Sequence, residues 1–186
     1  MPTTKIMVVR HAEKPVTGVA GVTAQGADDS EELTVQGWQR AGALIGLFSP
    51  PLGQACRPGL AIPQHLFASG IGPHSKSLRP QHTILPLSAK LGQKIDTSIL
   101  KGDEAKLADR ITNVGGIVLV AWEHEAIPTI AQAILGQAGS CPANWPDNRF
   151  DLVWVFDRAI GAGPWSFSQV PQLLLAGDEA SLISLE

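Results

Sequence analysis

The sequence predicts an α/β fold built on a mostly parallel sheet, and three observations support this prediction. Residues 6–9 and 117–122 are runs of consecutive apolar residues without polar alternation, which is typical of strands buried on both faces of a sheet. Segments with helical spacing separate the strands along the chain, as they do in βαβ units. The length of 186 residues and the hydrophobic content of 44% fit one domain, residues 1–186, with a single core.

The first half of the chain alternates between strand and helix. After the strand at residues 6–9, a helix is expected over residues 34–48, because Thr34 can cap it and apolar residues recur in it every three or four positions. Residues 64–69 form a second, shorter expected strand. A second helix is expected over residues 75–91, with Pro80 accepted in its first turn.

The second half continues this alternation and ends in strands. Residues 165–169 alternate between polar and apolar side chains, which predicts a late edge strand, with an antiparallel direction as one option. The apolar tail, residues 172–186, either adds a strand or docks on a partner subunit, and a homodimer is therefore one of the two alternatives. The remaining expected elements are a short edge strand at 95–96, a helix at 103–114, a strand at 115–122, a helix at 126–135 and a strand at 151–157.

Composition and charge exclude several classes of function. The formal net charge of −3 gives no general electrostatic reason to bind nucleic acid. No apolar run approaches the roughly 20 residues of a membrane span, and residues 1–5 lead into the first strand without the apolar segment of a signal peptide. We therefore expect a cytoplasmic protein that binds neither nucleic acid nor membrane. Cys56 and Cys141 have no metal-ligand spacing and are either free thiols or, as the less favoured alternative, a disulfide.

Two of the expected buried strands end in a histidine. Arg10 and His11 follow the first strand, and His124 follows the strand at 115–122 between two glutamates. In open α/β sheets the ligand crevice lies outside the carboxyl ends of the strands, so this matched pair favours one shared site. Arg79 adds a second guanidinium near the start of a helix, where free N–H groups favour anions. Since no glycine-rich nucleotide loop follows, the four side chains indicate a clamp for a tetrahedral dianion.

Two neighbouring features have structural interpretations. The loop at residues 15–32 ends in a cluster of carboxylates, and we expect a solvated connection there rather than a lip over the site. Arg40 lies in the helix away from the strand ends, so a surface ion pair or a structural bond is expected rather than catalysis.

These residues resemble the histidine phosphatase superfamily, which has the phosphoglycerate-mutase-like fold. Val9–Lys14 is similar to the Arg-His signature of that superfamily, residues 79–83 to its second arginine motif, and His124 to its second histidine. The Leu-Thr, Gly and Arg-Ala positions within residues 33–41 resemble its next element, and residues 150–155 are similar to a late segment of its small members. These segments occur along the chain in the same order as in the family.

The resemblance covers residues 5 to about 156 and implies a fold and a reaction. The implied fold is a three-layer α/β/α sandwich about a mostly parallel sheet, and the implied reaction passes through a phosphohistidine without a metal or an organic cofactor. In this scheme neutral His11 attacks phosphorus, while Arg10, Arg79 and His124 hold the equatorial oxygens. A backbone carbonyl or a carboxylate should bind the other ring nitrogen of His11 and fix its tautomer.

The leaving oxygen needs a proton, and three carboxylates are candidates to supply it. Glu125 directly follows the second histidine, as the acid does in the acid-phosphatase branch of the family, and we prefer it to Asp96 and Asp103. Glu13 either supports His11 or forms an ion pair with Lys14.

Other polar residues near the motifs have weaker assignments. Lys14, Ser75 and Lys76 are further candidate contacts for phosphate or substrate. His74 and His82 are expected to be structural or exposed.

The leading hypothesis is a phosphatase that acts on phosphomonoesters or phosphohistidine, in a small molecule or a peptide. A sugar-phosphate mutase is the enzymatic alternative, although mutases of this type are usually longer. A pseudophosphatase that binds phosphate without turnover is the non-enzymatic alternative.

Overall fold

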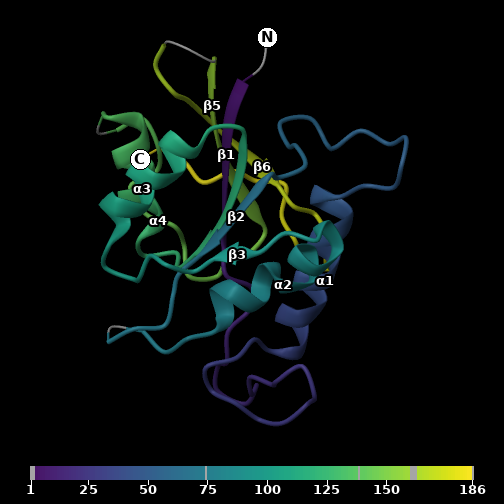
Figure 1. Cartoon of the computed structure of the whole chain (residues 1–186). Coiled ribbons are helices and arrows are strands. Elements are labelled where there is room, and N and C mark those ends of the chain that lie inside the picture. Colours follow the sequence, from purple (N-terminus) through teal and green to yellow (C-terminus); the bar gives the residue numbers. More distant parts are fainter. Residues whose placement is uncertain (1–2, 74, 138, 160–162, 186) are drawn as a thin grey trace.

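The fold is organised around the strand β1 (Thr3–Arg10), which lies inside a six-stranded sheet of order β3-β2-β4-β1-β5-β6 (Figure 1). The structure is a computed structural model that describes residues 3–73, 75–137, 139–159 and 163–185. The other strands are β2 (His65–Ala68), β3 (Ile95–Asp96), β4 (Ile117–Trp122), β5 (Leu152–Ala159) and β6 (Ser166–Pro171). The helices are α1 (Val35–Phe48), α2 (Arg79–Leu91), α3 (Glu104–Val114) and α4 (Ile127–Leu135).

The sheet is mostly parallel, as predicted. β4 pairs in parallel with both β1 and β2, and β2 pairs in parallel with β3. β5 runs antiparallel to β1, and β6 runs antiparallel to β5, so β5 alone opposes the common direction of this sheet. The predicted short edge strand β3 and late edge strand β6 are both confirmed, and β6 is antiparallel to its neighbour.

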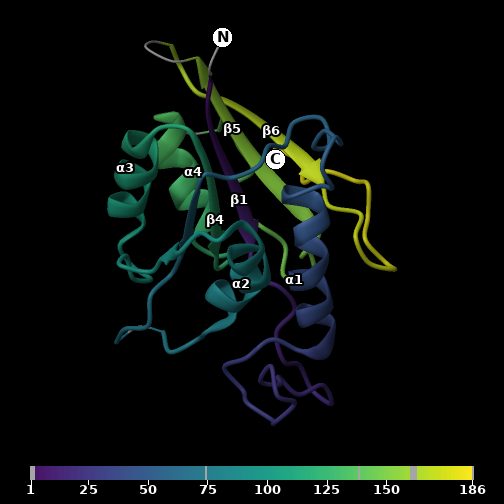
Figure 2. The ribbon, with the colours of Figure 1, turned by 45° about the vertical axis from the view of Figure 1, so that its right-hand side comes forward.

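Helices cover both faces of the sheet, which gives the expected three layers (Figure 2). Consecutive residues of β1 point to opposite faces, and residues 6–9 have no exposed surface. Ile6 and Val8 pack with apolar residues of α3 and α4 in one hydrophobic cluster. Met7 and Val9 pack with α1 and α2 in the other. The α/β class is therefore confirmed, and the core consists of one apolar layer on each side of the sheet.

Local signals explain where two of the helices begin. The Thr34 hydroxyl accepts a hydrogen bond from the Gly37 amide at 3.1 Å and caps α1 as predicted. The prediction that the second helix begins at residue 75 is wrong, since α2 begins at Arg79. Pro80 occupies its first turn, where the missing N–H costs no hydrogen bond and the fixed φ suits the helix.

The tail after β6 adds no strand within residues 172–185, so this alternative is wrong. It packs on its own chain instead. The Gln169 side chain donates to the Ile183 carbonyl at 2.7 Å and accepts from its amide at 3.1 Å, and Ile183 packs against the core. Cys56 and Cys141 are free thiols, the favoured alternative. In the described ranges no helix is long and apolar enough to span a membrane.

Candidate active site

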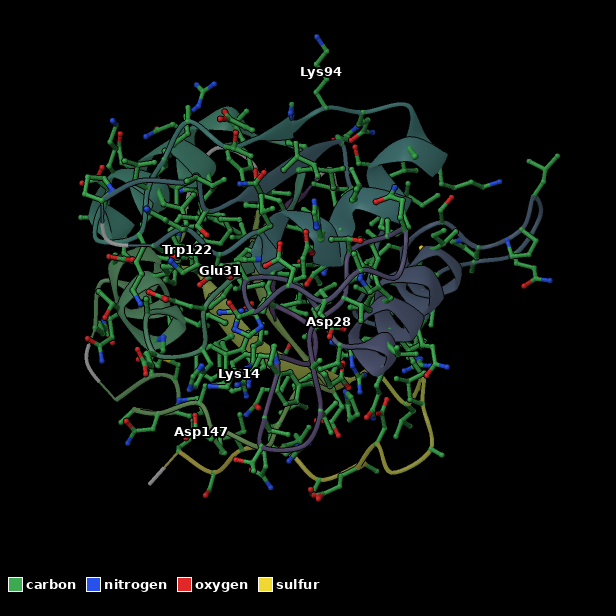
Figure 3. The ribbon with its side chains drawn as sticks, turned by 90° about the horizontal axis from the view of Figure 1, so that it is seen from below. Lys14, Asp28, Glu31, Lys94, Trp122 and Asp147 are labelled. Carbon is green, nitrogen blue, oxygen red and sulfur yellow. The ribbon has the colours of Figure 1, made fainter. Side chains whose placement is uncertain are left out.

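The carboxyl ends of β1 and β4 bring the first and second histidines to one edge of the sheet. Arg10 lies opposite Trp122 in the parallel register, and the His11 amide donates to the Trp122 carbonyl at 2.8 Å. His124 follows two residues after Trp122, so it leaves the sheet beside His11. Because β5 is antiparallel to β1, the segment that leads into β5 reaches the same edge. Figure 3 views the molecule from this side.

Thr83 connects the segment after β1 to the first turn of α2. Its hydroxyl accepts a hydrogen bond from the Ala12 amide at 2.8 Å and donates to the Arg79 carbonyl at 2.7 Å. Thr83 is fully buried, so water does not compete for these bonds. This side chain therefore ties the backbone of Arg79 to the backbone of Ala12, the residue that follows His11.

Arg10 is buried to 1% exposure and is held mainly by backbone oxygens. Its Nη1 donates to the carbonyls of residues 146, 147 and 149 at 3.1, 2.6 and 3.2 Å. The guanidinium carbon lies 3.8 Å above the centre of the Phe150 ring, a cation–π contact. Burial lowers the pKa of Arg10 to about 10, against the charges of Asp147, Glu13 and Glu125, so the group stays cationic at neutral pH.

A backbone hydrogen bond holds His11 in one tautomer. Its Nδ1 lies 2.7 Å from the Ala12 carbonyl, which can only accept, so Nδ1 carries the proton and Nε2 has the lone pair. This confirms the expected backbone carbonyl partner. Burial to 5% exposure lowers the pKa of His11 from 6.5 to about 3, against the Ala12 hydrogen bond and together with the charges of Arg10, Arg79 and His124. The two guanidinium groups therefore act on a neutral imidazole at His11.

Arg79 faces the end of the acidic loop. Its Nη1 donates to the Ser30 carbonyl at 2.9 Å. Burial lowers the pKa of Arg79, and the nearby carboxylates of Glu31, Glu32 and Asp29 oppose this shift. The loop therefore lies against the site, and the prediction of a merely solvated connection is wrong for this part of it.

Glu32 shows most directly why that prediction fails. It is 3% exposed, and its Oε2 lies 2.6 Å from Nδ1 of His82. A carboxylate buried against an imidazole on α2 fastens the loop to that helix, which a sequence pattern alone does not reveal. His82 is therefore structural, as expected, whereas His74 lies outside the described residues.

His124 is paired with a carboxylate that the sequence analysis missed. Its Nε2 lies 2.5 Å from Oδ1 of Asp147, whose side chain is 82% exposed. Burial, with the charge of Arg10, lowers the pKa of His124, and the Asp147 bond opposes this shift. The same bond holds the pKa of the Asp147 carboxyl below its usual range.

Unpartnered buried nitrogens gather on the predicted site residues. Six buried side-chain nitrogen or oxygen atoms have no hydrogen-bond partner among the described residues, and four of them belong to this site. These four are Nε and Nη2 of Arg10, Nε of Arg79 and Nδ1 of His124. Buried polar groups are normally paired, and a bare buried guanidinium N–H is costly. The arrangement is thus suited to an anion that offers several oxygens.

The remaining residues predicted to contact substrate or supply a proton differ in how they interact with Arg10 and His124. Glu125 is exposed, lines a cavity with His124 and Asp147, and acts electrostatically on Arg10. Lys14 is half-buried and its charge acts on His124. Ser75 and Lys76 form no hydrogen bond or ion pair with the clamp in the ranges that the structure covers; Ser75 instead accepts from the Ser77 amide at 3.3 Å.

The alternative proton donors are directed elsewhere. Asp96 accepts hydrogen bonds from the amide and hydroxyl of Ser98 at 2.9 and 2.6 Å, which lower its pKa. Asp103 is exposed at the start of α3. Among the described residues, no group of three or more metal-ligating side chains could hold a metal ion.

Both predictions for Glu13 are wrong. Its carboxylate pairs with Arg40, with Oε1 2.8 Å from Nη2, rather than with His11 or Lys14. Nη2 of Arg40 also lies 2.7 Å from Oδ1 of Asp178, and the guanidinium is 3% exposed. Arg40 thus makes the structural bond that was one of its two predicted roles. The pair joins residues 27 positions apart, so spacing gives no sign of it.

Comparisons with known proteins give only distant structural similarity. No family model matches the chain, and no curated protein matches it. A solved structure titled "Mycobacterial hydrolase 2" is 13% identical, and the alignment covers 99% of this chain and 94% of that chain with a TM-score of 0.49. A mycobacterial glucosyl-3-phosphoglycerate phosphatase in complex with VO3 is 14% identical, with 89% and 97% covered and a TM-score of 0.49. The functional argument below therefore rests on the residues of this chain.

Proposed function

We propose that this chain is a histidine phosphatase that hydrolyses phosphomonoesters or phosphohistidine through a covalent phosphohistidine on His11. The observation that supports this most is the set of unpartnered buried nitrogens on Arg10 and Arg79 beside a neutral imidazole. Phosphate offers a tetrahedral set of charged oxygens, and guanidinium groups bind such oxygens with strong, charge-assisted hydrogen bonds. A dianion at this position gives the buried donors their partners.

The first step forms a P–N bond. Nε2 of His11, whose lone pair is free because Nδ1 donates to Ala12, attacks phosphorus from the side opposite the leaving group. The bond from phosphorus to the leaving oxygen or nitrogen breaks, and the electron pair departs with that atom. Arg10 and Arg79 bind the equatorial oxygens and offset the charge of the transition state. His124 joins them as the imidazolium, whose Nδ1 donates to an oxygen while Nε2 stays bonded to Asp147.

The departing atom takes up a proton, and we assign this role to Glu125. Glu125 lines a cavity with His124, and its charge raises the pKa of Arg10. Neither Asp96 nor Asp103 is among the charges that shift the pKa of Arg10. In the second step water attacks phosphorus, the P–N bond breaks, and inorganic phosphate leaves. Deprotonated Glu125 accepts the proton of that water, which restores the starting state.

The test is hydrolysis of p-nitrophenyl phosphate by the wild type, His11→Asn and the control His65→Asn. His65 begins β2 at the opposite edge of the sheet, so its substitution removes an imidazole far from the clamp. We expect turnover in the wild type and the control, none in His11→Asn, and an acid-labile phosphoenzyme only where His11 is present. Turnover that survives in His11→Asn contradicts the proposal. Phosphate binding without any turnover indicates the pseudophosphatase, and phosphate transfer between sugar hydroxyls indicates the mutase.

A further inference from the structure

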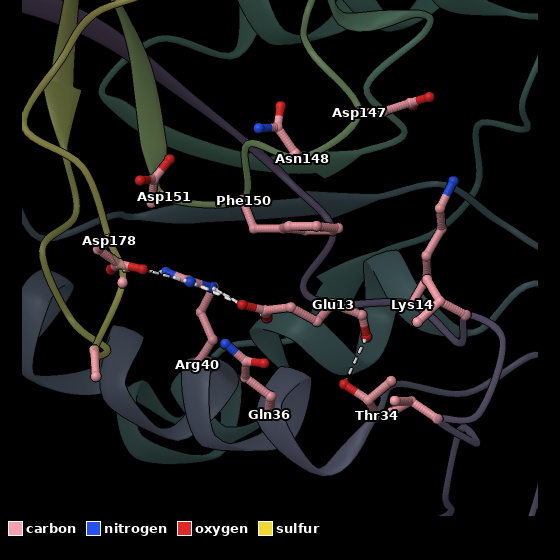
Figure 4. A pocket seen from close by; sticks show the side chains of 14 residues that line it. Glu13, Lys14, Thr34, Gln36, Arg40, Asp147, Asn148, Phe150, Asp151 and Asp178 are labelled. Carbon is pink, nitrogen blue, oxygen red and sulfur yellow. Dashed lines mark hydrogen bonds and ion pairs between the residues drawn. The ribbon is translucent and has the colours of Figure 1, made fainter.

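Figure 4 shows a cavity of about 520 Å³ that is lined by Lys14, Asp147 and Phe150 among others. It shares Lys14, Asp147 and Phe150 with the surroundings of Arg10 and His124. The Phe150 ring that supports the Arg10 guanidinium also forms part of the cavity wall. Asp147 also lines the neighbouring cavity that contains His124 and Glu125, so a group that departs from phosphorus beside Glu125 lies next to the 520 Å³ cavity.

The wall beside Phe150 is apolar and held in place by backbone hydrogen bonds. Val16 and Val19 line the cavity and are 61% and 50% exposed. Their amides and carbonyls bond to each other reciprocally, at 3.1 and 2.9 Å, across a turn that contains Gly18 with a φ of +82°. Residues paired in this way present their side chains on the same side, so the two valines form one surface.

The charged groups of the cavity disfavour an additional anion. Its lining contains four carboxylates but only two cations. Arg40 is already bound on both sides by Glu13 and Asp178, as Figure 4 shows, so its guanidinium is not available to a ligand. Lys14 forms no ion pair in the described part of the chain, and it lies at the end of the cavity nearest the clamp. The carboxylates of Glu13 and Asp178 are engaged by Arg40 in turn, and Asp151 is paired with Arg149 at 2.7 Å, so the deeper part of the cavity offers a second phosphate or carboxylate no unpaired cation among the described residues.

We propose that this cavity receives the leaving group of the substrate and selects an apolar, aromatic leaving group that carries no second acidic group. This inference rests on the proposed phosphatase function and names its substrate class. The volume lies within the range that accommodates a small organic ligand. The Phe150 ring is covered on one face by Arg10 and has the His11 ring at 6.3 Å between centroids, and the part of this half-buried ring that lines the cavity can stack against an aromatic group.

Two matched substrate pairs test this assignment. We expect kcat/KM for 1-naphthyl phosphate to exceed that for phenyl phosphate by about tenfold, because the second ring buries more apolar surface. We expect glycerol 3-phosphate to exceed 3-phosphoglycerate by about tenfold, because only the latter brings a carboxylate into the acidic cavity. Both substrates of the first pair release an aryl alcohol, and both substrates of the second pair release an alkyl alcohol, so the chemistry of the leaving oxygen is the same within each pair.

Val19→Asp should reduce the preference for 1-naphthyl phosphate by about tenfold, since it places a charge in the apolar wall while keeping the backbone bonds of the turn. The control is Val35→Asp, which adds the same charge at the exposed start of α1, outside the cavity. It should keep the wild-type preference. Two results would overturn the cavity assignment: an unchanged preference of Val19→Asp for 1-naphthyl over phenyl phosphate, or a wild type that favours 3-phosphoglycerate over glycerol 3-phosphate. If hydrolysis still depends on His11, the proposed phosphatase function is unaffected by either result. A wild type that hydrolyses phosphohistidine but none of the four phosphomonoesters overturns this inference alone, and one that hydrolyses neither class overturns the phosphatase proposal as well.

Discussion

The depressed pKa of His11 leads to a quantitative prediction about acid stability. In the unfolded chain this imidazole has its ordinary pKa of 6.5, whereas in the folded protein the pKa is about 3. Between pH 7.5 and 5.0 the unfolded state therefore takes up a proton at this position and the folded state does not. The contribution is close to zero above pH 6.5 and destabilises the folded protein increasingly as the pH falls. Over this interval it amounts to about 2 kcal/mol, roughly 1.5 pH units at 1.36 kcal/mol each.

His11→Asn removes this contribution while its amide nitrogen can still donate to the Ala12 carbonyl. We expect the wild type to lose about 2 kcal/mol more of its free energy of unfolding than His11→Asn when the pH is lowered from 7.5 to 5.0. Urea unfolding followed by tryptophan fluorescence at both pH values measures the difference, with Val35→Asn, an exposed substitution on α1, as the control that should follow the wild type. Parallel losses in wild type and His11→Asn, within about 0.5 kcal/mol, would refute a neutral, buried His11.

Three further substitutions test other parts of the site. Arg79→Ala should lower kcat by about 100-fold or more through the loss of a transition-state charge donor, while Arg110→Ala, on the exposed side of α3, should retain the wild-type kcat; equal rates would exclude a clamping role. Arg40→Met should lower the free energy of unfolding by about 3–5 kcal/mol because two buried carboxylates lose their partner, and a loss below about 1 kcal/mol would contradict this. Asp147→Asn should lower the pKa of His124, as read from the NMR titration of its ring, because the carboxylate that favours the charged imidazole is gone; an unchanged or higher pKa would show that the pair does not persist in solution.

The sequence was sufficient to predict the parts of the site that follow parallel strands. Two buried apolar runs, each ending in a histidine, place His11 and His124 at the same edge if the strands are parallel, and the register of Arg10 with Trp122 confirms the common edge. The alternation of strands and helices likewise predicted the α/β class. These features depend on local periodicity, which a single sequence contains.

The missed residues depend on strand direction and on pairs distant in the chain. The apolar pattern of a buried antiparallel strand is the same as that of a buried parallel one. The pattern of β5 therefore did not reveal its direction, and Asp147 and Phe150 were not assigned to the site. The bonds of Glu13 with Arg40 and of Glu32 with His82 join positions 27 and 50 residues apart. Local sequence contains no sign of such distant partners, so Glu13 was assigned to its neighbours His11 or Lys14, and Glu32 to solvent.

The anchoring of Arg10 by main-chain oxygens has a consequence for how this protein can diversify. The carbonyls at positions 146, 147 and 149 are present whatever side chains those positions carry. Substitutions that change the chemistry of this loop toward new leaving groups can therefore accumulate while the guanidinium keeps its place. Under the proposed function, the backbone of these residues fixes the geometry of phosphate recognition, and their side chains determine the choice of substrate.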